Sequence, residues 1–455
     1  MNNISKSIDV LNLEWGSSPN RDRQMSTLVC NYLRLQGLTV VEGSIWKGAE
    51  LMRCHRPKVL FMASAIGDKL NFETMRYAVK NGITGITLVA EGNFSPEPDS
   101  VDAFIWGSGN NSEQVLYESQ QLMWSERTRQ IFVDAYPEWA SRLYVSGAVG
   151  FDIYQIQEKI DKTKFLTELG FSTFTKVVGV GCWDFGTSYA KDYRNEIALN
   201  RFGQAQCDRF KKDGKLFNSI LRSVIEANPD ILFLLKEHPG RQLGALASGI
   251  EGLESLPNTL IIHKEKHVIE CIGASDIWLS YESTTAIEAW LLGVQTGLIN
   301  PSGRDFSRAS LHKGSPNFSN ADSLQQAIRC YFQNCELPGF STRVDHRAEI
   351  IEETIQWDDG LNHVRAGNMI LQNLKNISDP ESKLNFLSKF SLREKLRWGL
   401  SACPIHPRLK EYKTRSRAFA EDELFEFTER RYKEQVAFYK SLNLSKEQLL
   451  KFNCS

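Results

Sequence analysis

The residues best placed for chemistry in this sequence are hydroxyl side chains at a predicted strand-to-helix turn. Ser280 ends an apolar run. The hydroxyl residues that follow, where helical spacing begins, are Ser283, Thr284 and Thr285. The N-terminus of a helix presents unpaired N–H groups and the positive end of the helix dipole, so hydroxyls there suit a phosphate group. The alternative is that Ser283 only caps the helix.

A second group of candidates follows the apolar run 231–235. Lys236 and His238 stand at the carboxyl end of this predicted strand, where Pro239 stops further pairing. Lysine and histidine can both donate hydrogen bonds to a phosphate or polarise a leaving group. In open parallel sheets ligands bind beyond the carboxyl ends of the strands, where this motif and the hydroxyl turn both lie. The alternative is a histidine with a structural hydrogen bond only.

A third candidate is an acidic residue in the first half of the chain. Glu91 ends a predicted strand, and Gly92 allows the tight departure that exposes its carboxylate. A carboxylate that faces a cleft between two domains can act as a general acid or base. The alternative is an ordinary glutamate in a turn.

The elements that must position these residues are short apolar strands alternating with helical segments, which is typical of parallel sheets with crossover helices. In the first half we expect strands at Ile8–Glu14, Thr39–Gly43, Lys58–Ala63, Thr84–Ala90, Val101–Trp106 and Arg142–Ser146. In the second half we expect strands at Lys176–Trp183, Ile231–Glu237, Thr259–His263, Asp276–Ser280 and Gln295–Asn300. Expected helices include Asp22–Gln36, Asp152–Leu169, Leu216–Ala227 and Ser283–Leu292.

This alternation predicts two Rossmann-like α/β domains, residues 1–150 and 151–340, followed by a helical C-terminal extension, residues 341–455. In the extension, residues 383–417 contain ten Lys and Arg but only two acidic residues, and leucines recur every four positions from Leu392 to Leu400. Such a basic amphipathic segment can lie on an anionic membrane surface. The alternative is a helix whose leucines pack on the second domain, because an amphipathic pattern does not say what the apolar face contacts.

Composition and charge exclude several classes of function. The 455 residues carry 54 Lys and Arg against 55 Asp and Glu, a net charge of −1, which gives no support to nucleic-acid binding. No run approaches the roughly 18 apolar residues of a membrane span, and the nine cysteines show no disulfide-scaffold spacing. His263 and His267 lack a third zinc ligand, and no Asp-x-Asp motif or glycine-rich phosphate loop is present. We therefore expect a cytoplasmic protein without metal or cofactor.

The order of these motifs resembles that in the GT-B glycosyltransferases of bacterial surface-carbohydrate (capsule and O-antigen) biosynthesis, such as the Kdo transferases and the bacterial sialyltransferases. The resemblance covers about residues 8–300 and implies two Rossmann-like domains facing a cleft. His238-Pro239 and Ser283-Thr284 match its two nucleotide motifs. Glu91 and the glycine after it match the last two positions of an acidic-acidic-Gly motif, which is incomplete because an alanine precedes Glu91.

The resemblance also implies roles for residues outside these motifs. Glu288 would bind the ribose hydroxyls, and Asp184 would act as a nucleophile or a sugar ligand. The alternatives are a solvent-facing glutamate and an aspartate in a turn. Glu14, at the end of the first strand, and Arg21, at the start of the first helix, would lie on the acceptor side.

The function implied is metal-independent transfer of a sugar, from a CMP-activated ulosonic acid of the Kdo or sialic type, to a surface polysaccharide or glycolipid. Glu91 would handle the proton of the acceptor hydroxyl, with His238 and the hydroxyl turn on the phosphate. The alternatives within the fold are a UDP-sugar transferase, a sugar-nucleotide 2-epimerase and a CDP-polyol phosphotransferase. A non-catalytic sugar-nucleotide-binding protein is an alternative of another class. Glycans of this kind are built on lipid-linked acceptors, so we also expect peripheral contact with the inner face of the cytoplasmic membrane through residues 383–417.

Overall fold

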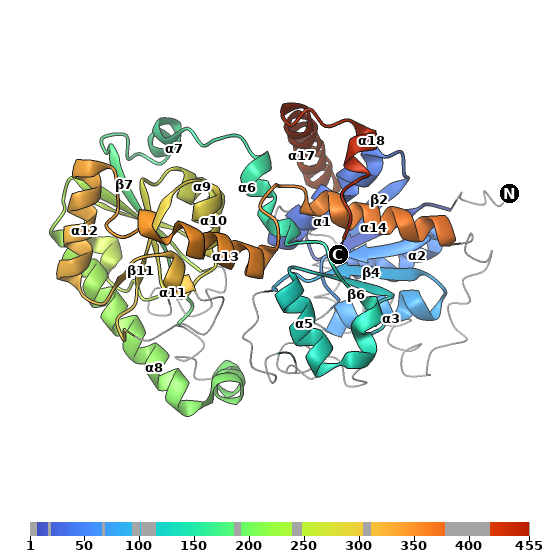
Figure 1. Ribbon diagram of the computed structural model, residues 1–455, viewed down its shortest axis with the longest axis horizontal. Helices are drawn as coiled ribbons and strands as arrows, with labels where there is room; N and C mark the ends of the chain where they lie inside the picture. Colours follow the sequence, from blue (N-terminus) through green and yellow to red (C-terminus); the bar gives the residue numbers. More distant parts are fainter. Residues whose placement is uncertain are drawn as a thin grey trace, which may run out of the picture. The chain divides into compact units, whose positions relative to one another are not determined.

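The computed structural model describes residues 7–16, 20–65, 69–92, 101, 115–185, 193–238, 248–303, 311–377 and 419–454, and it divides into two units (Figure 1). The first unit comprises residues 1–156 together with 353–455, and the second comprises residues 157–352. The C-terminal helical part expected at residues 341–455 contributes its residues from Glu353 onward to the first unit.

The first unit is built on a parallel sheet of six strands in the order β2-β1-β3-β4-β5-β6. The strands are β1 (Val10–Glu14), β2 (Val40–Ser44), β3 (Val59–Met62), β4 (Thr84–Leu88), β5 (Gln120–Met123) and β6 (Leu143–Val145). Both faces are covered, since Val10 and Phe61 belong to one apolar cluster while Leu11 and Leu60 belong to another. Alternate residues of each strand thus enter opposite cores, as expected for a parallel sheet between helical layers.

Helices of the first unit come from both ends of the chain. Those of the N-terminal part are α1 (Arg21–Leu35), α2 (Gly48–His55), α3 (Lys69–Lys80), α5 (Glu126–Ala135) and α6 (Ile153–Ile156), with 3₁₀ turns at Ile45–Lys47, Pro137–Arg142 and Val149–Phe151. Those of the C-terminal part are α14 (Asn362–Asn376), α17 (Glu421–Ser441) and α18 (Lys446–Leu449). Both α14 and α17 contact α1, which gives the apolar face of α1 its cover (Figure 1).

A buried polar network fixes the C-terminal helices to the rest of the first unit. The Nδ1 atom of His363 on α14 lies 2.8 Å from the Asp152 carboxylate, and its Nε2 atom lies 2.5 Å from the hydroxyl of Tyr439 on α17. The backbone N–H of His363 also donates to Asp152 (2.6 Å). His363 and Asp152 are almost fully buried. Since buried polar groups are costly without partners, these bonds make the position of both helices specific.

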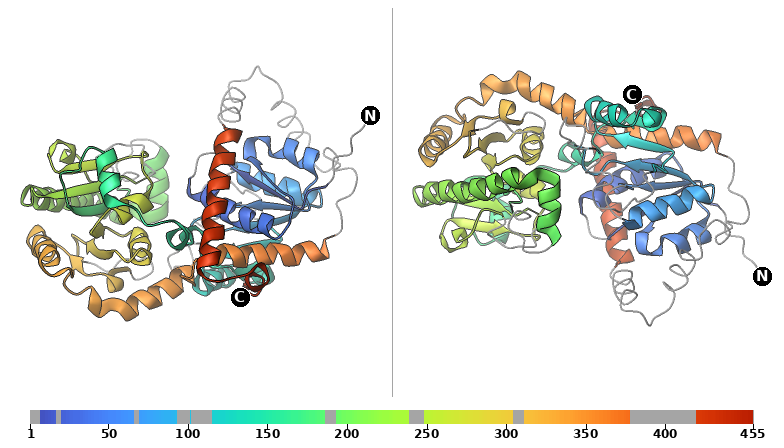
Figure 2. Two further views of the ribbon diagram at one scale, coloured as in Figure 1. Left: turned by 90° about the horizontal axis from the view of Figure 1, so that it is seen from above. Right: turned by 90° about the horizontal axis from the view of Figure 1, so that it is seen from below.

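The second unit, drawn from green to orange in Figure 2, has its own parallel sheet of six strands. The strand order is β12-β11-β10-β7-β8-β9. The strands are β7 (Lys176–Gly181), β8 (Ile231–Lys236), β9 (Thr259–Ile262), β10 (Ile277–Ser280), β11 (Gln295–Ile299) and β12 (Asn317–Phe318). The helices are α7 (Lys162–Glu168), α8 (Tyr193–Glu226), α9 (Val268–Gly273), α10 (Thr285–Leu291), α11 (Leu311–Gly314), α12 (Ala321–Asn334) and α13 (Val344–Ile355), with 3₁₀ turns at Leu253–Ser255 and Ser341–Arg343. The backbone is non-helical at Gly203, where φ is 73°, so α8 is kinked there.

Two differences from the sequence-based expectations concern strands and helices. Of the expected strand Val101–Trp106 only Val101 is described, and it is helical, while the strand that pairs with β4 beyond β3 is β5. The expected helix Asp152–Leu169 is two short helices, α6 and α7, separated by residues 157–161. The basic segment 383–417 lies outside the described residues. Within the described part of the chain, no helix has the length and apolarity that crossing a membrane requires.

Candidate functional site

Each sheet has one point at which the strand order reverses, and the candidate residues gather at these two points. In the second unit the chain leaves β7 toward β8 on one side and returns to β10 on the other. In the first unit the same reversal separates β1 from β3. Such switch points open a crevice at the carboxyl ends of the strands, which is where open α/β sheets bind their ligands. We therefore describe the two edges in turn.

The hydroxyl turn of the second unit, residues 283–285, follows β10 at the switch point. The Ser283 hydroxyl oxygen accepts a bond from the Thr285 N–H (3.3 Å) and another from the Thr285 hydroxyl (3.1 Å). Because both bonds use the oxygen of Ser283 as acceptor, its own O–H proton is left to donate elsewhere. The N–H and hydroxyl of Thr284 enter none of the hydrogen bonds of this turn. These groups suit an anionic ligand.

Thr285 is different, because its hydroxyl is directed back onto the sheet. It accepts from the indole N–H of Trp278 (3.1 Å), and it lies so close to Gly181 that a Cβ there would come within 2.7 Å of it. The contact of Thr285 with phosphate expected from the sequence is therefore replaced by a contact within the protein. Ser280, paired in register with Gly181, is buried, and its hydroxyl has no hydrogen-bond partner in the described residues.

The strand-end motif after β8 also differs from expectation. The Lys236 ammonium donates to the backbone carbonyl oxygen of His263, just after β9, and its contact with phosphate stays a prediction. Glu237, a residue that the sequence did not single out, is buried and lies 2.5 Å from Nδ1 of His263. His238 is half-buried at the carboxyl edge, and Pro239 lies outside the described residues.

Near the switch point a buried carboxylate bonds to two loops. Asp213 on α8 accepts from the hydroxyl of Tyr281, after β10 (2.5 Å), and from that of Ser302, after β11 (3.1 Å). Trp183, after β7, packs against Tyr281 with ring centroids 5.8 Å apart. The expected donor-side residue Asp184 is therefore next to an anchored aromatic ring, and it is half-buried. Glu288, on α10, is half-buried as well.

At the edge of the first unit the structure brings two candidates together that are 70 residues apart. The Arg21 guanidinium donates to the carboxylate of Glu91 over 3.1 Å, and both side chains are exposed. Glu14 ends β1 and is buried, with its Oε1 bonded to the Ala63 N–H after β3. Glu14 therefore lies at the switch point itself. Burial raises the pKa of its carboxyl to about 8.

Gly92 is required by a close approach of Trp124. A Cβ at Gly92 would lie 2.3 Å from the indole ring, and this ring is held by a hydrogen bond from its Nε1 to the Val89 carbonyl oxygen (2.5 Å). The sequence-based explanation, a tight turn that exposes Glu91, therefore misses the packing reason for the glycine.

We expect Gly92→Ala to lower the free energy of unfolding by about 1–3 kcal/mol, because the buried indole cannot move without breaking its bond. Urea unfolding measures this change. Glu91→Ala is the control, since the ion pair that it removes is exposed and should contribute less than about 1 kcal/mol. Equal stability of Gly92→Ala and the wild type would contradict the packing argument.

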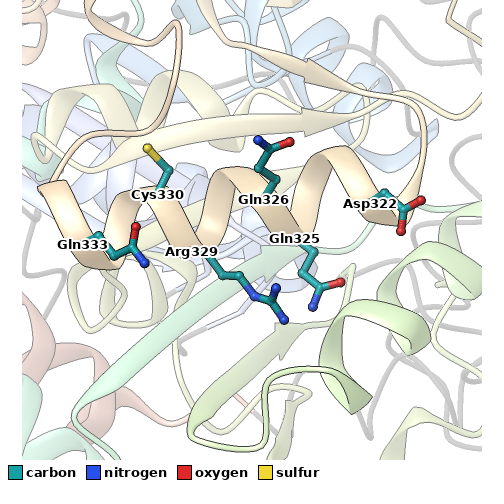
Figure 3. A pocket seen from close by; sticks show the side chains of 6 residues that line it. All are labelled: Asp322, Gln325, Gln326, Arg329, Cys330 and Gln333. Atoms are coloured by element: carbon teal, nitrogen blue, oxygen red, sulfur yellow. The ribbon is translucent and has the colours of Figure 1, made fainter.

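The described residues also contain a pocket away from these candidates. It has a volume of about 530 Å³, and its six lining residues all lie on α12 (Figure 3). Figure 3 shows these side chains spread along a single helix, so they do not converge on one point. No group of three or more His, Cys, Asp and Glu side chains in the described ranges could hold a metal ion.

Comparison with known proteins identifies the fold. No protein-family model matches the chain, and no curated protein matches it. Among solved structures, a UDP-N-acetylglucosamine 2-epimerase matches with 11% identity and a TM-score of 0.51, covering 83% of this chain and 99% of its own. The S. aureus MnaA–UDP co-structure has 11% identity and a TM-score of 0.51, and the match covers 81% of this chain and 98% of that chain. The wall teichoic acid polymerase TagF has 11% identity and a TM-score of 0.54, and the match covers 82% of this chain and 90% of that chain. The chain thus has the GT-B fold: two Rossmann-like domains, with helices at its C-terminal end.

Proposed function

We propose that this chain is an enzyme that acts on a nucleotide-activated sugar, and that its second unit binds the nucleotide. The observation that carries the proposal is the hydroxyl turn 283–285 at the switch between β7 and β10, where the hydrogen bonds within the turn leave the donors of Ser283 and Thr284 unused. His238 follows β8, which lies next to β7 on the side away from β10, so it stands at the same edge of the sheet. Hydrogen-bond donors placed there stabilise the charge that develops on a departing nucleotide without a metal ion.

For the reaction we propose transfer of the sugar to a hydroxyl of a glycan or glycolipid, which the motif resemblance implies. The first unit would bind this acceptor near Glu14 and Arg21. The motifs favour a CMP-linked ulosonic acid as donor. The structural neighbours, a UDP complex and a UDP-N-acetylglucosamine 2-epimerase among them, give better support to a UDP-sugar as substrate and to 2-epimerisation as the alternative reaction.

Nucleotide binding is the first test. We expect one of CMP, CDP and UDP to raise the melting temperature by several degrees with EDTA present, because a ligand at 100 times its Kd stabilises the folded state by about 2.7 kcal/mol. The double variant Ser283→Ala/Thr284→Ala should lose most of this shift. Thr342→Ala removes an exposed hydroxyl of the same unit and should keep it. If no nucleotide stabilises the wild type, the proposed function is wrong.

Product analysis then separates the reactions. Conversion of a UDP-sugar without an acceptor would identify an epimerase, and acceptor-dependent release of the nucleotide would identify a transferase. Binding without turnover of the corresponding CMP-, CDP- or UDP-linked substrates would identify a non-catalytic binding protein. Membrane contact through residues 383–417 stays a prediction from sequence, and sedimentation with anionic liposomes at low salt tests it.

A further inference from the structure

The carboxyl group of Glu14 has two oxygens in different surroundings. Oε1 accepts hydrogen bonds from the Ala63 N–H (2.8 Å) and from Nδ2 of Asn12 (3.3 Å). Oε2 accepts none from the residues that the structure describes. The residue keeps only 4% of its surface exposed, at the switch point between β1 and β3. Hydrogen bonds to Oε1 therefore hold the Glu14 side chain in place, and Oε2 can exchange a proton with a substrate.

The orientation of Asn12 decides which oxygen of Glu14 can carry a proton. The guanidinium of Arg23 can only donate, so the Asn12 atom 3.0 Å from its NH1 is the carbonyl oxygen. The amide nitrogen of Asn12 then faces Glu14 and the carbonyl oxygen of Phe61 (3.1 Å). Both partners of Oε1 are consequently donors. A proton on this carboxyl group must lie on Oε2.

The charged and titratable groups that face Glu14 come from α1 and from β2, the strand that pairs with β1. Burial disfavours the carboxylate and raises its pKa to about 8, and the nearby Asp22 acts in the same direction. Arg23 opposes this shift, but its guanidinium is shared with Glu42, 3.3 Å away. The thiol of Cys30 is buried, and burial raises its pKa, so it adds no charge. Glu14 is thus a stronger base than an ordinary carboxylate.

Glu91 has the opposite surroundings, although the sequence suggested it as the proton-transferring group. Its carboxylate is exposed and paired with Arg21. An exposed carboxylate held by a guanidinium suits the positioning of that arginine. A general base is most efficient when its pKa lies near the working pH, which the buried carboxyl group of Glu14 satisfies.

We propose that Glu14 takes the proton of the acceptor hydroxyl through Oε2, and that Glu91 positions Arg21. This proposal rests on the transfer reaction proposed above. The acceptor oxygen bonds to the anomeric carbon as its proton passes to Oε2. The bond from that carbon to the phosphate oxygen breaks, and the nucleotide leaves with the electron pair. Glu14 then returns the proton to water.

Glu14→Gln is a sharp test because glutamine keeps the bonds of Oε1 and replaces only Oε2. We expect kcat to fall by roughly 10²–10⁴-fold, with nucleotide affinity and melting temperature retained. In the wild type, about one-tenth of Glu14 is ionised at pH 7, so kcat should rise about tenfold per pH unit below the inflection and level off above about pH 8. Glu91→Gln should raise KM for the acceptor and keep this inflection.

Glu118→Gln is the matched control. Glu118 is a buried carboxyl group whose pKa burial raises to about 7, but it precedes β5 and so lies at the amino edge of the same sheet. Its replacement should leave kcat and the pH profile unchanged. Retention of more than a tenth of the wild-type kcat by Glu14→Gln, or loss of the inflection in Glu91→Gln alone, would overturn the proposal. Failure of the wild type to bind any nucleotide would instead refute the proposed function.

Discussion

Replacing His238 with alanine is expected to lower kcat by about 10²–10³-fold, the loss typical of removing one donor to a developing negative charge. His238 is half-buried, two residues beyond the end of β8 and at the carboxyl edge of the sheet. A side chain in this place contributes little to the core. The melting temperature should therefore change little while turnover collapses, and steady-state kinetics with the identified nucleotide-sugar measures the effect.

The control for this variant is His346→Ala, which removes an exposed histidine of α13 paired with Glu349. It should keep full activity. A His238→Ala enzyme with more than half of the wild-type rate would remove His238 from the site. A large loss of melting temperature would show that the histidine is structural, which is the alternative that the sequence left open.

The second large effect concerns stability. Glu42→Ala is expected to lower the free energy of unfolding by about 3–5 kcal/mol, because it leaves a buried charge without its partner. The Glu42 carboxylate accepts from Arg34 (2.7 Å), from Arg23 (3.3 Å) and from the hydroxyl of Thr27 (3.1 Å). Arg23 is fully buried, so water cannot replace the lost carboxylate.

Urea unfolding at neutral pH checks this expectation, with Glu126→Ala as the matched control in the same unit. Glu126 forms an ion pair with Arg129 at 2.8 Å, but its side chain is about half exposed. Exposed pairs contribute about 0–1 kcal/mol, so the control should stay within that range. Similar losses in both variants would mean that burial of Arg23 does not set the cost.

Most strands of both sheets could be predicted because a buried parallel strand is a nearly continuous apolar run. β5 could not, since its sequence Gln-Gln-Leu-Met lacks such a run although Gln121 is fully buried. β12 is only two residues long. The helical character of the C-terminal part was predictable, but its attachment to α1 was not, because an amphipathic pattern does not identify the surface that it packs against.

The candidate site was predictable to the same degree. A motif at a strand end predicts that its residues lie at the carboxyl edge of the sheet. His238 and the hydroxyl turn do lie at that edge. It does not predict the direction of a side chain, so the turning of Lys236 to the His263 carbonyl group was missed. The anchoring of Tyr281 by Asp213 joins residues 68 positions apart, and no local pattern signals it.

The return of residues 353–455 to the first unit fixes an order of assembly during synthesis. Residues 157–352 form a unit that lies entirely between the two segments of the other, so it can fold as soon as it leaves the ribosome. The first unit must wait for α14 and α17. At about 5–20 residues per second, its last 103 residues take roughly 5–20 s to appear. During this interval the part of α1 that packs against α14 and α17 has no cover, so a chain that stops early exposes an apolar surface of the kind that promotes aggregation.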